Sequence, residues 1–138
     1  MRVKRIRNTL ENEKGQSLVE FALAVPMLLL LVFGIAEFGR AWMTQNILTG
    51  AAREAVRLAA VPAPGGGWNG SAAETRGNQI LVSAGIATTV SVQNAASPFG
   101  DVTATVNYDF PVVLVGFIPG LNSSTLPLTS TTTMRREY

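Results

Sequence analysis

Residues 15–42 read GQSLVEFALAVPMLLLLVFGIAEFGRAW, and this stretch decides the fold. No charged side chain occurs between residues 21 and 36, and over residues 18–36 the apolar run is interrupted only by Glu20. An α-helix of about 19 residues is roughly 28 Å long, which matches the hydrocarbon thickness of a bilayer. The sequence therefore predicts a transmembrane segment over residues 18–36.

The charges that precede this segment predict its orientation. Residues 1–15 carry five basic and two acidic side chains, whereas the net charge of the whole chain is only +2. A basic arm directly before an apolar run keeps the N-terminus of a membrane protein in the cytoplasm. A nucleic-acid-binding protein would instead carry basic and aromatic side chains together on a folded face. We expect a single-pass protein of the cytoplasmic (inner) membrane, with its N-terminus inside, surrounded by lipid and with no nucleic acid as a primary ligand.

A secretory signal peptide also combines a basic start with an apolar run. The apolar part of such a peptide usually has about 7–15 residues, and small residues at alternate positions precede the cleavage site. The present run is longer, and the following residues 37–42, EFGRAW, lack that pattern. The sequence favours a membrane helix, and a secreted enzyme behind a cleaved signal remains as an alternative.

The composition excludes much of enzyme chemistry. Without any cysteine or histidine, the chain has no disulfide, Cys/His zinc site, His-ligated haem, cysteine nucleophile or His-based triad. Asp101 and Asp109 fall on one predicted strand without a third carboxylate, and the glycines 65–67 are not followed by a lysine. We therefore expect no catalytic residue, no metal and no cofactor.

The helix is predicted to continue beyond the membrane as a spine helix over residues 16–61. Pro26 removes one backbone donor and predicts a bend, which membrane helices tolerate. Glu54 and Arg57 are three residues apart and are expected to pair on the surface. Beyond the membrane, apolar side chains recur on one helical face, at Leu48, Ala52, Ala55, Val56 and Ala59.

Residues 62–138 are predicted to form a small domain outside the membrane. A loop rich in proline and glycine leads to a short helix over residues 71–85. Ser71 is expected as its N-cap, with Glu74 completing a capping box. The expected buried side chains of this helix are Ile80, Leu81 and Ala84, and Gly77 weakens the prediction.

Alternating apolar residues predict strands at about 88–93, 102–110 and 126–134. Three antiparallel strands need an apolar partner, and the amphipathic half of the spine helix supplies one. The apolar residues 111–121 are expected either as a loop in the core or as a surface that touches a neighbouring subunit. The predicted fold class is α+β, with a small antiparallel sheet of about three strands packed on the C-terminal half of a long N-terminal helix.

The start of the apolar segment carries a recognisable motif. Gly15 is followed by four residues and then by Glu20 and Phe21, after a short basic leader at residues 1–15. This arrangement resembles the class III signal of type IV pilin-like proteins. The longer string over residues 15–42 resembles the TadE-like pseudopilins of tight-adherence pili, and TTTMRREY at residues 131–138 is similar to the ending of that family.

The resemblance implies how such a chain is processed and used. A membrane-embedded prepilin peptidase would cut between Gly15 and Gln16, which leaves Glu20 as the fifth residue of the new chain. A pilus assembly platform, powered by a separate ATPase, would then draw the subunit into an extracellular helical filament of identical or related subunits. Such filaments serve cell adhesion, secretion or DNA uptake, and the subunit is a structural protein rather than an enzyme.

Glu20 has a physical role in this hypothesis. An unpaired carboxylate is costly inside an apolar filament core. Pairing with the amine of Gln16 from an adjacent subunit would neutralise both charges and fix the axial register, with Leu18, Val19 and Phe21 as apolar contacts. Alternatively, Glu20 reaches the cytoplasmic edge of the bilayer and needs no partner.

A second functional hypothesis leaves the chain unprocessed. It would then be a single-pass membrane anchor that scaffolds a secretion or pilus assembly complex and never polymerises.

Overall fold

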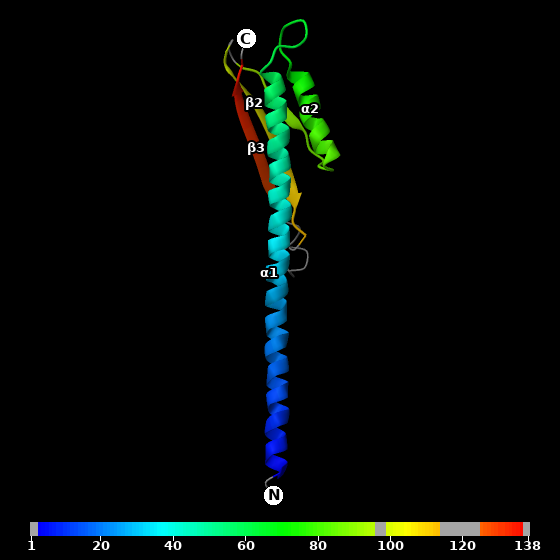
Figure 1. Ribbon diagram of the computed structural model, residues 1–138, viewed down its shortest axis with the longest axis vertical. Helices are drawn as coiled ribbons and strands as arrows, with labels where there is room; N and C mark the ends of the chain where they lie inside the picture. Colours follow the sequence, from blue (N-terminus) through cyan, green and yellow to red (C-terminus); the bar gives the residue numbers. More distant parts are fainter. Residues whose placement is uncertain (1–2, 96–98, 114–124, 137–138) are drawn as a thin grey trace. The chain divides into compact units, whose positions relative to one another are not determined.

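The structure is a computed structural model that describes the backbone of residues 3–95, 99–113 and 125–136, with side chains from residue 15 onward. The chain divides into two compact units, Met1–Phe38 and Gly39–Tyr138. Figure 1 shows the helices and strands that the described ranges form. In chain order, these are α1 (Val3–Ala59), α2 (Gly70–Ser83), β1 (Val90–Gln93), β2 (Asp101–Pro111) and β3 (Thr125–Arg135).

Helix α1 contains the predicted spine helix. It ends at Ala59, close to the predicted end, but it begins at Val3, within the residues expected as the leader. This early start is compatible with the local sequence, because Arg, Leu, Glu and Lys are good helix formers and no proline precedes Pro26. The helix continues through Pro26, and the bend expected there stays a prediction.

The core of the second unit lies between one face of α1 and the sheet. All five predicted apolar positions on α1 are fully buried, and Ala51 joins them. Four of these six residues are alanines, whose small side chains let the sheet approach the helix closely. The core positions contributed by the sheet and α2 are Ala73, Leu81, Val90, Val102, Ala104 and Val106. The predicted packing of the sheet on the C-terminal half of the spine helix is confirmed.

The sheet has the strand order β1-β2-β3, and both pairs of neighbours are antiparallel. All three predicted strands are therefore confirmed. β1 pairs with only four residues of β2, whereas β3 pairs with β2 along its whole length, from Thr125 opposite Pro111 to Arg135 opposite Asp101. The prediction for the apolar residues 111–121 falls mostly outside the described part of the chain, which stops at residue 113 and resumes at residue 125.

The start of α2 differs from the prediction. The N-cap is Asn69 rather than Ser71, and it makes no side-chain capping hydrogen bond. Glu74 closes no capping box, because its Oε1 accepts a hydrogen bond from the backbone N–H of Val92, at 3.0 Å. The predicted capping box is wrong because a tertiary contact with β1 occupies the carboxylate that the box requires.

The buried face of α2 also differs in part. Leu81 is buried as predicted and Ile80 is half-buried, but Ala84 is exposed because it follows the last helical residue. Ala73 and Gly77 complete the buried face instead. Gly77 lets the helix approach the sheet, since a Cβ built on it would lie 2.6 Å from Cγ2 of Val90 and 3.2 Å from the Cβ of Ala55.

We predict that Gly77→Ala destabilises the domain by about 1–3 kcal/mol, because the added methyl group overlaps a stiff valine. Gly50→Ala is the matched control, since that helical glycine has open space around it and alanine favours helix by up to about 1 kcal/mol. Denaturant unfolding in detergent measures both. The Val90→Ala substitution should lower the free energy of unfolding by less in the Gly77→Ala background than in the wild type. An equal decrease in both backgrounds would contradict the overlap.

Candidate assembly helix

The residues 18–38 of α1, here called the apolar segment, expose their side chains along the whole length. Val25 is half-buried, and the exposed fractions of the other large apolar residues range from 47% at Leu29 to 75% at Met27. A soluble monomer rarely shows a contiguous apolar surface of this size. Within the described residues, α1 is the one helix long and apolar enough to cross a membrane, and none of its apolar window is buried in the protein. The apolar segment therefore requires lipid or other protein around it.

The predicted site residues lie together at the start of this segment. Gly15, Gln16, Leu18, Val19, Glu20 and Phe21 all belong to α1 and are all exposed. Successive helical residues are rotated by about 100°, so Gln16 and Glu20 share one ridge while Leu18 and Phe21 lie on the opposite side. The structure thus places a polar ridge and an apolar ridge on the same helical turn.

Gln16 and Glu20 are in direct contact. The side-chain amide Nε2 of Gln16 donates a hydrogen bond of 3.1 Å to Oε1 of Glu20. The sequence pointed to the main-chain amine of a processed Gln16 as the partner of Glu20, and this side-chain contact was not among the predictions. The signal was present, because residues four apart on a helix are neighbours.

Gly15 has open space around it. A Cβ built on Gly15 meets no atom within 4 Å among the described side chains, and the backbone there is helical. Glycine inside a helix costs roughly 0.5–1 kcal/mol relative to alanine. Gly15 therefore weakens the helix next to the bond between Gly15 and Gln16.

A charged cluster on the surface of the second unit confirms one predicted pair. Glu54 accepts two hydrogen bonds from Arg57, at 3.0 and 3.1 Å, and its Oε1 is also 3.5 Å from Nε of Arg76 on α2. The contact with Arg76 was not predicted, because only the tertiary packing of α2 beside α1 brings this residue near. Hydrogen bonding by Arg57, supported by the charges of both arginines, lowers the pKa of Glu54 although partial burial opposes this shift.

The lowered pKa of Glu54 predicts a pH dependence. The cluster contributes its full stabilisation above the ordinary glutamate value of 4.5, and it loses this contribution as the pH falls through the lower pKa of the folded state. The effect should be small and weakened by salt, because both arginines are exposed. Between pH 6 and pH 3, the free energy of unfolding should fall more steeply for the wild type than for Glu54→Gln. Parallel curves for the two proteins would contradict the assignment.

Two further features of the described residues bear on the expected chemistry. In these ranges no three acidic side chains lie close enough to hold a metal ion. Two hollows on α2 are lined mainly by Ser, Thr, Ala, Gln and Val side chains, with Arg76 as their one charged residue. Neither hollow brings together an acid and a base, or a nucleophile and an activating group.

Part of α1, including the apolar segment, matches a known protein family. Residues 15–57 match the TadE-like protein family. The match begins at Gly15, and it contains the apolar segment and most of the buried face of α1. It confirms the TadE-like resemblance predicted from the sequence, and together with the exposed helix it fits a pilin-like protein associated with the tight-adherence pilus. No curated protein and no solved structure matches the chain.

Proposed function

We propose that this chain is a pilin-like structural subunit that inserts in the cytoplasmic membrane and assembles through its apolar segment into a tight-adherence pilus. The observation that carries the proposal is the exposure of this segment over about six helical turns. The buried core of the other unit begins at Leu48 and includes no side chain of the apolar segment. The segment is thus available first to lipid and then to the helices of identical or related subunits.

The surroundings of Glu20 support assembly rather than simple anchoring. Gln16 satisfies only Oε1 of this carboxylate, and Oε2 accepts no hydrogen bond from a described residue. At the edge of a bilayer, water would solvate the free oxygen. In a bundle of apolar helices that water is absent, so a cation from a neighbour is needed. Cleavage after Gly15 would create such a cation, the amine of Gln16, one helical turn before Glu20.

Removal of the leader would also release the subunit from the membrane. Residues 1–15 carry five basic side chains, which favour retention at the cytoplasmic face. A prepilin peptidase that cuts after Gly15 would remove all five, and a pilus assembly platform would then extract the helix. Gly15 suits this step, because it weakens the helix at the bond to be cut and contacts no other side chain.

We predict that the cellular protein lacks residues 1–15, which intact-mass measurement detects. Gly15→Leu should leave the chain at full length, because the larger side chain favours helix and alters the cleavage position. Gly34→Leu is the matched control, since that glycine is also helical and surrounded by open space, and it should be processed normally. A full-length wild-type chain would contradict processing.

We predict that Glu20→Ala inserts in the membrane and is processed, but that its fibre yield falls by at least about tenfold, since an unpaired buried charge is strongly destabilising. Quantitative immunoblotting of membranes and of sheared surface fibres measures both steps. Gln16→Ala is the control, because it removes the side-chain amide and keeps the main-chain amine, so fibres should form. Normal fibres from Glu20→Ala would show that the pairing is not needed.

One observation favours the alternative function, an unprocessed membrane anchor that scaffolds a secretion or pilus assembly complex. Helix α1 runs without interruption from Val3 through Gly15 and Gln16, so the bond to be cut lies within regular helix. A peptidase must open this helix before it can cut, whereas a permanent anchor would keep it. The mass measurement separates the two functions, because an anchor keeps its leader.

A further inference from the structure

The two edges of the sheet are protected to different extents. An unpaired strand edge offers backbone N–H and C=O groups to any extended chain, so proteins usually cover or block it. At the β1 edge, Asn78 Oδ1 of α2 accepts a hydrogen bond of 2.7 Å from the N–H of Val90, and Glu74 Oε1 accepts one of 3.0 Å from the N–H of Val92. The side chains of α2 therefore satisfy the outward amides of β1.

The opposite edge, formed by β3, is blocked only at its start. The side-chain amide of Gln45 on α1 donates a hydrogen bond of 2.9 Å to the carbonyl oxygen of Thr129. Two residues earlier, Pro127 has no N–H to offer. In an antiparallel sheet the N–H and C=O of one residue point to the same side. The odd-numbered residues of β3 therefore point away from β2, which agrees with the hydrogen bond from the N–H of Arg136 toward Gly100.

The second half of this edge is open. The odd-numbered residues Thr131, Thr133 and Arg135 direct their backbone groups outward, and no described residue bonds to those groups. The hydroxyls of Thr131 and Thr133 do not cover the edge, because they lie 3.5 and 3.3 Å from the hydroxyls of Thr105 and Thr103 on β2. We call Thr131, Thr133 and Arg135 the open edge.

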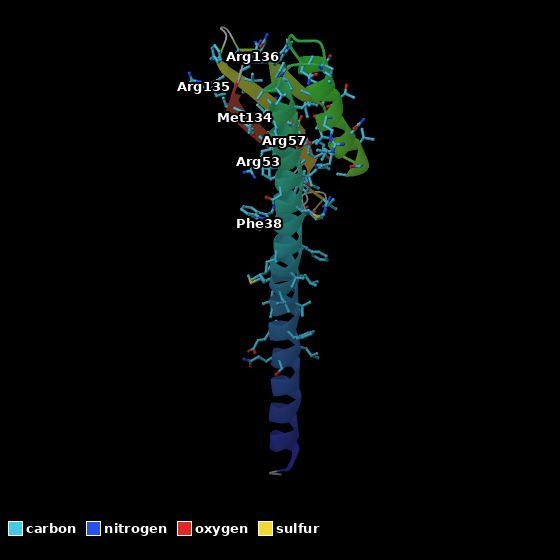
Figure 2. The ribbon with its side chains drawn as sticks, turned by 45° about the horizontal axis from the view of Figure 1, so that its top comes forward. Phe38, Arg53, Arg57, Met134, Arg135 and Arg136 are labelled. Atoms are coloured by element: carbon cyan, nitrogen blue, oxygen red, sulfur yellow. The ribbon has the colours of Figure 1, made fainter. Side chains whose placement is uncertain are left out.

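One arginine of α1 lies beside the open edge. Gln45 contacts Thr129, and Thr49 accepts a hydrogen bond of 3.1 Å from Ser130, so this ridge of α1 follows β3. A four-residue step along the same ridge leads to Arg53, which is exposed. Figure 2 shows Arg53 on the same side of the domain as Met134 and Arg135 of β3.

The positive charges near the open edge are not neutralised. Arg53 makes no hydrogen bond or ion pair with the described residues, whereas Arg57 is held by Glu54 together with Arg76 of α2. Arg135 uses its Nε to bond the carbonyl oxygen of Phe99, which leaves its positive charge in place. Two guanidinium groups, those of Arg53 and Arg135, therefore lie near the open edge.

We propose that the open edge binds an extended acidic segment of another protein by β-strand addition. The added strand would bond the outward backbone groups of Thr131, Thr133 and Arg135, and a carboxylate on its helix-facing side would meet Arg53. Two copies of this chain are poor partners for each other here, because pairing their open edges would bring like charges together. The proposal does not depend on assembly through the apolar segment.

Binding of two synthetic peptides to the full-length chain in a zwitterionic detergent tests the proposal. The first peptide alternates Glu with Val and has blocked ends, and the matched control replaces each Glu by Lys. We expect the Glu peptide to bind at least about tenfold more tightly, with the preference weakening as salt rises. Hydrogen exchange should slow at the amides of Thr131 and Thr133. Equal affinity for both peptides, or slower exchange at the β1 edge instead, would overturn the proposal.

Two pairs of variants separate strand addition from simple charge attraction. Thr133→Pro removes one outward N–H and should abolish the slowed exchange at Thr131, whereas Thr133→Val keeps the N–H and should bind normally. Arg53→Glu should lose about tenfold in affinity for the Glu peptide, while Gln79→Glu on α2 introduces the same acidic side chain away from the edge and should not. Circular dichroism checks that each variant is folded.

Each negative result has a defined meaning. If folded Thr133→Pro binds the Glu peptide as well as Thr133→Val does, strand addition is wrong. Unchanged binding by Arg53→Glu shows that the partner is not selected by charge. A dimer of the wild-type chain that Thr133→Pro abolishes would identify a second copy as the occupant and would also overturn the proposal.

Discussion

The contact between the alanine-rich face of α1 and the sheet is the interaction on which the structure depends. Ala51, Ala52, Ala55 and Ala59 are fully buried, and around them Leu48 and Val56 fill the space that small side chains leave. A short three-stranded sheet cannot bury its apolar face alone, so the helix is a necessary part of the domain. Close approach then places the side chains of α1 and α2 near the strand edges, where they bond backbone groups.

The same helix has two kinds of surface because its neighbours differ along its length. In the domain, apolar side chains occupy one face and Arg53, Glu54 and Arg57 lie toward solvent. In the apolar segment, large apolar side chains surround the helix and are left exposed. A helix that is apolar on all sides is suited to lipid or to a bundle of similar helices. This property supports the proposal of a subunit whose helix leaves the lipid and joins such a bundle.

The charged and polar groups of α1 depend on their surroundings in different ways. Glu54 is half-buried, is held by two arginines of the same chain, and needs no partner from outside. Among the described residues, Glu20 is bonded by the amide of Gln16, which carries no charge, so the cost of its carboxylate depends on whether water, lipid or protein surrounds it. This difference is why Glu20, rather than Glu54, is the candidate for contact between subunits.

Local patterns in the sequence were sufficient for much of the fold. The apolar run predicted the exposed helix, helical periodicity predicted the buried positions on α1, and alternation predicted the three strands, because each pattern follows from the geometry of one element. The pairing of Glu54 with Arg57 was predictable for the same reason. The family resemblance rested on the motif around Gly15 and Glu20, and the match over residues 15–57 confirms it.

Contacts between elements could not be predicted in this way. Glu74 has the spacing of a capping box, yet it bonds the N–H of Val92, and Gly77 weakens a helix in isolation but allows it to approach Val90. Both outcomes depend on where α2 packs, since a side chain takes its partner from the element that lies next to it. The edges of the sheet show the same dependence. Side chains of α1 and α2 bond the outward groups of β1 and of Thr129, and their packing leaves the open edge uncovered. The sequence by itself determined which elements form and which faces are apolar, whereas the tertiary structure decided which backbone groups stay free.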